Sequence, residues 1–418
     1  MRVLVLGSGG REHALVRSLA QDPAVSALFC APGNPGTASL AENHVLDPTD
    51  PQAVVELAVR LKITLVVIGP EAPLVAGVGD AVRREGIPCF GPDAGPARIE
   101  GSKAFAKEIM EAAGVPTARA HVCDSADQVS AALDAFGPPY VVKDDGLAAG
   151  KGVVVTLDRA EAAEHAAQCD RVVIEEYLDG PEVSLFALCD GEHAVALSPA
   201  QDFKRALDGD EGPNTGGMGA YTPLGWAPHG LVEEVMRTVV QPTIDELRRR
   251  NSPYVGVLYA GLALTSRGVR VIEFNARFGD PETQVVLDRL STPLATLLQA
   301  CAVGNLAPGT KLDWKPGSAV TVVVAAENYP GTPVKGDVIA GLDEADAVIG
   351  AYVLHAGTAL DEDGLIVSNG GRVLSVVGTG ADLAEARAVA YAATGRIRLR
   401  GARYRTDIAL KATENRVS

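Results

Sequence analysis

The residues best suited to chemistry lie in one stretch, Val271–Glu282, which reads VIEFNARFGDPE. Because side chains alternate between the two faces of a strand, Glu273, Asn275 and Arg277 are expected to share one face, and the residues between them the other. A carboxylate and an amide oxygen about 7 Å apart along a strand could both reach one Mg²⁺, which takes few protein ligands and completes its shell with phosphate oxygens. The guanidinium fork of Arg277 suits a phosphoryl group or a carboxylate. The alternative is a solvated strand edge with one salt bridge, which the flanking phenylalanines disfavour.

A second stretch, KDDGLAAGKG at positions 143–152, combines small residues with two cations, Lys143 and Lys151. Small residues let backbone N–H groups approach phosphate oxygens closely. The stretch is not a Walker A loop, because that motif needs Ser or Thr where Gly152 stands. Taken alone, it fits a flexible turn as well as a phosphate-binding loop.

Two further segments carry weaker signals. Positions 212–219 contain four glycines in eight residues and follow the sequence DFKR at 202–205. So many glycines indicate close backbone contact with a ligand or a mobile lid, although a long loop without function is the alternative. The apolar strand that ends at Glu175 could bind adenine through its backbone and ribose through Glu182. An acidic strand end is more often only a solvated boundary.

The N-terminal sequence GSGGRE at positions 7–12 opens a helix, where an anion is favoured. It fits the dinucleotide-binding fingerprint only in part, because Glu12 stands where Gly or Ala is required. Arg11 at the helix start favours a phosphate monoester over a pyrophosphate.

These segments lie between elements that must position them. Apolar strands at 3–6, 27–31 and 65–68 alternate with helices at 14–20 and 51–60, which predicts a doubly wound parallel sheet with ligands at the carboxyl ends of its strands. A single helix is expected over 97–113. Beyond it we expect a strand–loop–strand unit at 140–156, a strand at 172–175, a hairpin at 183–197, a helix at 231–250 and two strands at 256–274. Within the last hundred residues we expect strands at 320–326, 348–355 and 372–378 and one helix at 383–393.

Composition limits the possible functions. The 418 residues predict two to four domains, and 47% hydrophobic with 22% charged residues is typical of a globular protein. A net charge of −16 argues against non-specific nucleic-acid binding. No apolar run reaches the roughly 20 residues of a membrane span. Six cysteines without metal or CxxC spacing, and no signal segment at the start, favour a cytoplasmic protein.

Together these motifs resemble the ATP-grasp superfamily and, within it, the glycinamide ribonucleotide synthetase (phosphoribosylamine–glycine ligase) family. The resemblance covers essentially the whole chain, and the pairing of RFGDPE at 277–282 with PNTGGMGAY at 213–221 is specific to this family. It implies an α/β and α+β multidomain fold with a doubly wound N-terminal domain (1–100), a helical connection (101–118), an ATP-grasp lid subdomain (119–190), an ATP-grasp central subdomain (191–315) and a C-terminal β-rich domain (316–418).

The resemblance also implies a reaction and its partners. Glycine would be activated by ATP, with Mg²⁺ or Mn²⁺, to glycyl phosphate, and the amine of 5-phosphoribosylamine would then displace phosphate in a step of purine biosynthesis. Neither nucleic acid nor membrane is expected as a partner, and a monomer or weak homodimer is expected.

By the same resemblance, each motif residue receives a role. The catalytic residues would be Arg277, Lys143, Asp202 and Lys204, and Glu273 and Asn275 would hold the metal. The ATP-binding residues would be Lys103, Lys143, Gly150, Lys151, Gly152, Glu175, Glu176, Tyr177, Leu178 and Glu182. The substrate-binding residues would be Gly9, Gly10, Arg11, Glu12, Asn34, Gly36, Glu71, Asn214, Thr215, Gly216, Gly217 and Asp280.

The chain departs from the family pattern at three places. Asp144 stands where Ala is usual, Phe203 stands where His is usual, and the lid segment between Leu157 and Val172 is short. Three other interpretations remain open: a different ATP-grasp ligase or carboxylase, an oxidoreductase built on the N-terminal unit, and a nucleotide-binding protein without catalysis. The oxidoreductase would need a complete dinucleotide fingerprint, and the carboxylase would lack the paired family motifs.

Overall fold

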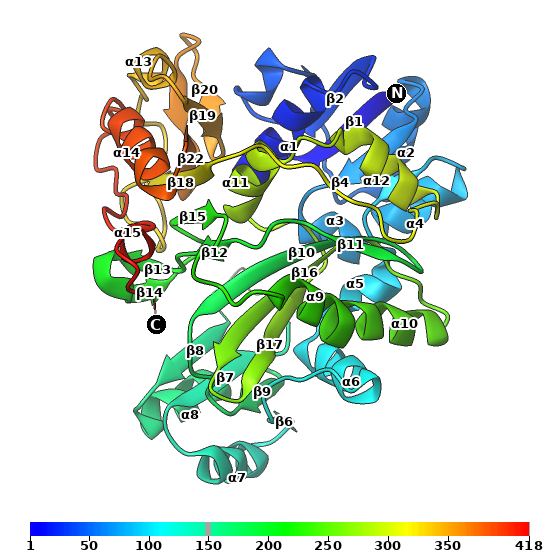
Figure 1. Ribbon diagram of the computed structural model, residues 1–418, viewed down its shortest axis with the longest axis vertical. Helices are drawn as coiled ribbons and strands as arrows, with labels where there is room; N and C mark the ends of the chain where they lie inside the picture. The colour runs from blue at the N-terminus through cyan, green and yellow to red at the C-terminus, as the bar shows by residue number, and fades with distance from the viewer. Residues whose placement is uncertain (147–151, 418) are drawn as a thin grey trace.

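Five parallel strands form the sheet of the N-terminal domain, at the upper right of Figure 1. The computed structural model describes residues 1–146 and 152–417. The sheet order β3-β2-β1-β4-β5 confirms the predicted doubly wound topology. Its strands are β1 (Arg2–Gly7), β2 (Ala27–Pro32), β3 (Glu42–Asn43), β4 (Leu65–Ile68) and β5 (Cys89–Phe90). Its helices are α1 (Gly10–Ala20), η1 (Thr37–Ser39), α2 (Pro51–Arg60), α3 (Glu71–Val75), α4 (Val78–Arg84) and α5 (Ala94–Gly101).

The predicted single helix over 97–113 is wrong, because the chain breaks at Ser102. Helix α5 ends at Gly101 and helix α6 (Lys103–Ala113) begins two residues later. Ser102 has extended backbone angles (φ −141°, ψ 115°), and its hydroxyl accepts a hydrogen bond from the N–H of Phe105. Ser102 is therefore the N-cap of α6, which fixes where that helix starts.

A small antiparallel sheet with two helices forms the lower lobe in Figure 1. The sheet has the order β6-β9-β7-β8, and β7 and β8 form the predicted strand–loop–strand unit. Its elements are β6 (Ala120–Cys123), α7 (Ala126–Phe136), β7 (Tyr140–Asp144), β8 (Val153–Thr156), α8 (Arg159–Ala167) and β9 (Val172–Glu175). Apolar residues of both helices, including Leu133 and Ala162, pack on Val142 and Ile174 of the sheet.

The central sheet, in the order β11-β10-β16-β17, contains the predicted hairpins. Its strands are β10 (Glu182–Asp190), β11 (Ala194–Ala196), β16 (Val255–Thr265) and β17 (Gly268–Asn275). The helix expected over 231–250 consists of α9 (Leu231–Val235), a π-helical segment η3 (Met236–Val240) and α10 (Gln241–Arg249). Helices α11 (Glu282–Arg289) and α12 (Leu294–Ala302) follow β17.

A five-stranded sheet in the order β12-β15-β18-β22-β19 joins the C-terminal region to the middle of the chain. Strands β12 (Gln201–Asp202) and β15 (Gly219–Thr222) come from the glycine-rich region, and β15 pairs antiparallel with β18 (Ser318–Ala325). The other elements of this region are β13 (Arg205–Leu207), η2 (Asp208–Asp210), β14 (Glu211–Asn214), α13 (Leu342–Asp346), β19 (Ala351–His355), β20 (Thr358–Leu360), β21 (Ile366–Ser368), β22 (Arg372–Gly380), α14 (Leu383–Thr394) and α15 (Leu410–Thr413). Helix α14 packs on β18 and β22.

Helix α11 lies at the meeting point of these parts. It contacts α1 of the N-terminal domain and strands β15 and β18 of the mixed sheet. The VIEFNARFGDPE stretch leads directly into it, so the predicted chemistry lies where three parts of the chain meet. Within the described part of the chain, no helix has both the length and the apolar character needed to cross a membrane.

Candidate active site

Strand β17 places Glu273 beside a lysine from the small sheet. The pairing of β17 with β16 shifts between Gly261 and Leu262, so Ile272 is the extra residue of a β-bulge. The carbonyl oxygen of Ile272 accepts a hydrogen bond of 3.0 Å from Lys143 Nζ at the end of β7. The bulge therefore joins β17, which carries Glu273, to β7, which leads into the KDDGLAAGKG stretch at 143–152.

Three lysines from separate segments act electrostatically on the Glu273 carboxylate. Burial acts to raise the pKa of Glu273, but Lys204, Lys143 and Lys103 outweigh it and hold the pKa below its ordinary value. The carboxylate therefore stays ionised at neutral pH among several cations. We call these four residues the glutamate–lysine cluster. Such a cluster suits a polyphosphate that brings its own negative charge and a divalent cation.

Lys103 contacts the beginning of the KDDGLAAGKG stretch at 143–152. Its ammonium donates a 3.0 Å hydrogen bond to the carbonyl of Gly146. Asp145 accepts from the N–H of Ala104 (3.0 Å) and from the Ser102 hydroxyl (3.1 Å), so it caps the N-terminus of α6. Burial lowers the pKa of Lys103. The predicted phosphate-binding residues Gly150 and Lys151 lie outside the described residues.

Lys107 is a residue that sequence reasoning missed. Its ammonium and that of Lys143 lie 3.0 and 2.8 Å from the two oxygens of Glu175, which is only 3% exposed. The spacing of four residues from Lys103, which puts both lysines on one helical face, was the available signal. Each oxygen of the Glu175 side chain thus has a lysine partner, so the predicted contact with adenine would fall to the backbone of this residue.

Strand β17 ends at Asn275, two residues before Arg277. The alternation of half-buried and buried side chains that was predicted for the strand nevertheless continues as far as Arg277. Its Nη2 is 3.0 Å from Glu100 Oε1, and its Nε is 3.3 Å from Glu71 Oε2 but without a hydrogen bond. Burial acts to lower the pKa of Arg277, but Glu100 and Glu71 raise it above its ordinary value. Arg277 therefore joins the central sheet to Glu71 at the start of α3 in the N-terminal domain.

Glu12 fills the space beneath the N-terminal turn. Its Oε2 accepts from the Gly9 N–H (2.6 Å), and its Oε1 lies 2.5 Å from Arg11 Nε. A Cβ atom on Gly69 would lie 2.1 Å from Glu12 Oε1, so any larger residue there would displace the Glu12 carboxylate. Arg11 also donates a 3.0 Å hydrogen bond to the carbonyl of Phe278. The N-terminal turn and the RFGDPE segment, far apart in sequence, are in direct contact.

Asn34 organises a second turn of the N-terminal domain. Its Oδ1 accepts from the Gly36 N–H (2.9 Å), while its Nδ2 donates to the carbonyls of Ser8 (2.8 Å) and His355 (3.0 Å). The N–H of His355 in turn donates to His13 Nδ1 at 2.8 Å. Strand β19 of the C-terminal region therefore supports the turns predicted to bind a phosphoribosyl group.

The PNTGGMG segment packs against the GDPE turn. The guanidinium of Arg372 on β22 donates from Nη1 to the carbonyls of Gly216 and Asp280, each at 2.5 Å. Its Nη2 lies 3.4 Å from Asp280 Oδ2. Burial acts to raise the pKa of Asp280, but Arg372 and Arg11 lower it. Thr215 is buried, and its hydroxyl accepts from the Gly217 N–H at 3.0 Å. Arg372 had no sequence signal, because it reaches this turn from a distant strand.

Asp202 and Lys204 lie on and just after β12, close to a group of carboxylates. Burial raises the pKa of Asp202 to about 7, with Lys204 opposing the rise and Glu282 adding to it. Lys204 Nζ is 2.6 Å from Glu182 Oε2. Glu282, a further residue that the site prediction omitted, accepts a 2.7 Å hydrogen bond from the Tyr259 hydroxyl.

The remaining predicted adenine-side residues are less tightly placed. Glu176 is paired with Arg119 at 2.9 Å and Arg267 at 3.1 Å, Tyr177 is 50% exposed, and Leu178 is half-buried. Two arginines therefore hold the Glu176 side chain in place. Asn275, the second predicted metal ligand, is half-buried opposite Tyr259 of β16.

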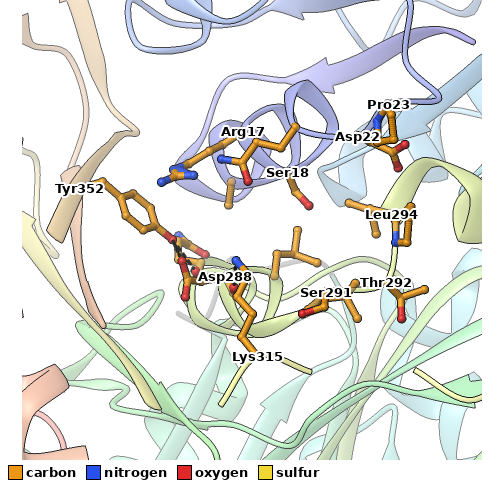
Figure 2. A pocket seen from close by; sticks show the side chains of 16 residues that line it. Arg17, Ser18, Asp22, Pro23, Asp288, Ser291, Thr292, Leu294, Lys315 and Tyr352 are labelled. Atoms are coloured by element: carbon orange, nitrogen blue, oxygen red, sulfur yellow. Dashed lines mark hydrogen bonds between the residues drawn. The ribbon is translucent and has the colours of Figure 1, made fainter. Parts of the chain in front are cut away.

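Figure 2 shows a separate groove of about 260 Å³ between α1, α11 and β19. The Arg17 guanidinium stacks on the Tyr352 ring at 3.8 Å, and the Tyr352 hydroxyl donates to Asp288 at 3.2 Å. Lys315 donates to the Asp288 carbonyl at 2.6 Å. These charged groups have partners within the protein, so the groove offers less to a phosphate than the glutamate–lysine cluster.

Models of phosphoribosylglycinamide synthetase match the chain over residues 1–100 (N domain), 101–283 (ATP-grasp domain) and 319–411 (C domain). With the fold described above, these matches define an ATP-grasp carbon–nitrogen ligase, a class that uses ATP and in general a divalent cation. The chain belongs to the phosphoribosylglycinamide synthetase family.

Individual relatives agree with this assignment. A phosphoribosylamine–glycine ligase of Streptomyces coelicolor is 67% identical over 99% of this chain and 99% of its own length. The crystal structure of the phosphoribosylamine–glycine ligase of Thermotoga maritima is 34% identical, with a TM-score of 0.85 over 98% of this chain and all of that one. Biotin carboxylase of Campylobacter jejuni, 12% identical with a TM-score of 0.73 over 100% of this chain and 97% of that one, shares the fold alone.

Proposed function

We propose that this chain joins glycine to 5-phosphoribosylamine at the expense of ATP, giving glycinamide ribonucleotide, ADP and phosphate. The observation that carries the proposal is the hydrogen bond from Lys143 to the Ile272 carbonyl, next to Glu273, together with the lowering of the Glu273 pKa by Lys204, Lys143 and Lys103. Several cations acting on one carboxylate suit a nucleoside triphosphate bound with a divalent cation. The relatives named phosphoribosylamine–glycine ligase support the choice of substrates.

Glu273 and Asn275 fit a Mg²⁺ or Mn²⁺ ion. Both are hard oxygen donors on neighbouring positions of one strand face, and the lysines keep the carboxylate ionised. Among residues 1–146 and 152–417, no group of three or more His, Cys, Asp or Glu side chains is arranged to hold a metal by itself. A cation with two protein ligands would take its remaining ligands from phosphate oxygens and water. When bound, it would neutralise charge that develops on the phosphates.

The remaining roles are those that the family resemblance implies. Lys103, Lys143 and Gly152, with Gly150 and Lys151 outside the described residues, would surround the phosphates. The segment from Glu175 to Leu178 would bind adenine, and Glu182, at the start of β10, the ribose.

Two separate groups of residues would bind the other two substrates, glycine and phosphoribosylamine. Asp202, Lys204 and Arg277, with Asn214–Gly217, would face glycine and the transferred phosphoryl group. The turns with Gly9, Gly10, Arg11, Glu12, Asn34, Gly36 and Glu71, together with Asp280, would hold phosphoribosylamine. Arg277 joins the two regions through its ion pair with Glu71.

The reaction needs no nucleophile from the protein. A carboxylate oxygen of glycine would attack the γ-phosphorus, which breaks the bond to ADP and forms glycyl phosphate. The amine nitrogen of phosphoribosylamine would then attack the acyl carbon, expel phosphate and lose one proton. Catalysis would rest on positioning and on stabilising charge.

Transfer of oxygen tests the proposal directly. Glycine labelled with ¹⁸O in its carboxylate should deliver one labelled oxygen to inorganic phosphate when phosphoribosylamine is generated in situ, measured by mass spectrometry. Alanine, serine and β-alanine serve as matched alternative carboxylates. Release of ADP without glycine, or unlabelled phosphate during turnover, would contradict the assignment.

A further inference from the structure

We propose that Lys107 is a positioning residue of the nucleotide site, which acts through Glu175 to keep the ammonium of Lys143 available to ATP phosphates. The inference rests on the proposed function, because it takes Lys143 as a phosphate-binding group. Lys107 itself would not touch the nucleotide.

The hydrogen bonds of Lys107 account for its whole donor capacity. An ammonium group has three N–H donors. Lys107 Nζ donates to Thr117 Oγ1 at 2.9 Å and to the Ala118 carbonyl at 2.9 Å, and it lies 3.0 Å from Glu175 Oε1. Its side chain is 12% exposed. With three acceptors in place, Lys107 has no N–H left for a ligand.

Lys143 differs in one respect. Among the residues that the structure describes, its Nζ has two acceptors, Glu175 Oε2 at 2.8 Å and the carbonyl of Ile272 at 3.0 Å. One N–H therefore remains for a phosphate oxygen. The side chain is 5% exposed, so its orientation is fixed by those two acceptors.

Glu175 couples the two lysines because each of its oxygens faces one of them. Removing the Lys107 ammonium would leave Oε1 without a partner in a buried position, which is unfavourable. Lys143 would then be the one cation left on both oxygens, and it would turn toward them and away from the phosphates. The net charge of the trio would also fall from +1 to zero, which weakens attraction for an anion.

Thr117 extends this arrangement to the central sheet. Its hydroxyl donates to the carbonyl of Val271 at 2.6 Å while it accepts from Lys107. Val271 precedes the bulged Ile272 on β17, so the same network holds the Val271 carbonyl through Thr117 and the Ile272 carbonyl through Lys143. Lys107 therefore lies behind the site, joined to it through Glu175 and through β17.

Lys107→Met tests the inference. The variant should bind a non-hydrolysable ATP analogue about tenfold or more weakly, as measured by isothermal titration calorimetry. The reason is that the Lys143 ammonium changes its orientation and the buried group of Lys107, Glu175 and Lys143 loses its net positive charge. It should raise the KM for ATP, while the KM for glycine changes by less than about twofold. The effect on AMP binding should be smaller than on the triphosphate. Lys107→Arg keeps the charge and should restore part of the affinity.

The controls separate the possible failures. Lys311→Met removes an exposed lysine away from this network and should bind the analogue like the parent protein. If Lys107→Met does not fold, Thr117→Val removes one of the three acceptors and should weaken the same binding by a smaller factor. Unchanged affinity in a folded Lys107→Met protein, or equal losses for AMP and the triphosphate, overturns the positioning role. Failure of the parent protein to bind the ATP analogue would instead overturn the proposed function.

Discussion

Gly217 lies directly against the ring of Pro281. A Cβ atom built on Gly217 would lie 2.4 Å from Pro281 Cδ, and the backbone φ of Gly217 is +111°. The two motifs that the sequence singled out as specific are thus in contact at this point, where only glycine fits. The close approach lets the PNTGGMG segment and the GDPE turn form one surface.

Gly217→Ala should therefore destabilise the protein and impair catalysis. The positive φ alone costs about 1–3 kcal/mol for a residue with a Cβ, and the rigid proline ring adds steric displacement. We expect a lower denaturation midpoint and a higher KM for glycine. Gly268→Ala is the matched control, because Gly268 has φ +93° but nothing within 4 Å of its Cβ position. Equal kinetic effects of the two substitutions would show that the contact with Pro281 is unimportant.

Glu273→Gln should nearly abolish turnover while the protein remains folded. The amide keeps the size of the side chain but removes the negative charge from the glutamate–lysine cluster. Loss of a metal ligand that stabilises transferring phosphates costs several kcal/mol, or roughly 100-fold or more in kcat. Steady-state kinetics with varied Mg²⁺ measure this loss. Glu192→Gln, on the exposed β10–β11 turn, is the control, and near-normal kcat in Glu273→Gln would refute the metal role.

Arg372→Met should lower kcat/KM for glycine without changing ATP affinity. The substitution leaves the carbonyls of Gly216 and Asp280 without their shared donor, at a cost of about 1–3 kcal/mol, which corresponds to about 5–150-fold. Arg372→Lys should retain part of the activity, because it can still reach one carbonyl. If both variants weaken binding of the ATP analogue as strongly as they affect glycine, Arg372 acts on the whole site rather than on this turn.

Acid should destabilise the protein through its buried histidines. Burial, together with His355 and Arg17, lowers the pKa of His13 to about 3, and burial lowers the pKa of His355 to about 4. Each unfolded histidine takes up a proton near pH 6.5, whereas the folded one does not, so stability is present above pH 6.5 and is lost as the pH falls from there toward 3. At pH 5, each histidine should lower the free energy of unfolding by about 2 kcal/mol relative to pH 7.

His13→Asn isolates one of these contributions. Asn Oδ1 can still accept the hydrogen bond from the His355 N–H, but it does not titrate. Urea denaturation at pH 7 and pH 5 should show a smaller loss of stability in the variant than in the parent protein. An identical loss in both would mean that His13 does not contribute to the pH dependence.

Sequence patterns predicted the local elements well, because those signals act over short distances. The alternation of Glu273, Phe274 and Asn275 was sufficient to place the acid and the amide on one face, and Pro51–Arg60 was predicted with its observed bounds. The break at Ser102 was missed because the apolar pattern of 97–113 runs through it, although Ser is a common N-cap.

Contacts that form only on folding could not be read from single motifs. Arg372 and Asp280 lie on distant segments, and so do Asn34 and His355. Lys107 was missed because a lysine at helical spacing gives no sign of a buried carboxylate partner. Family resemblance supplied the roles of Asp202 and Lys204, and those roles stay predictions.

The pairing of β15 with β18 has a consequence for dissecting the protein. A truncated chain ending near residue 316 would keep every proposed nucleotide ligand, yet Gly219–Thr222 would become an unsatisfied outer edge open to self-association. The last hundred residues therefore cannot be removed without exposing this strand, and a fusion protein built from the nucleotide-binding part would have to include them.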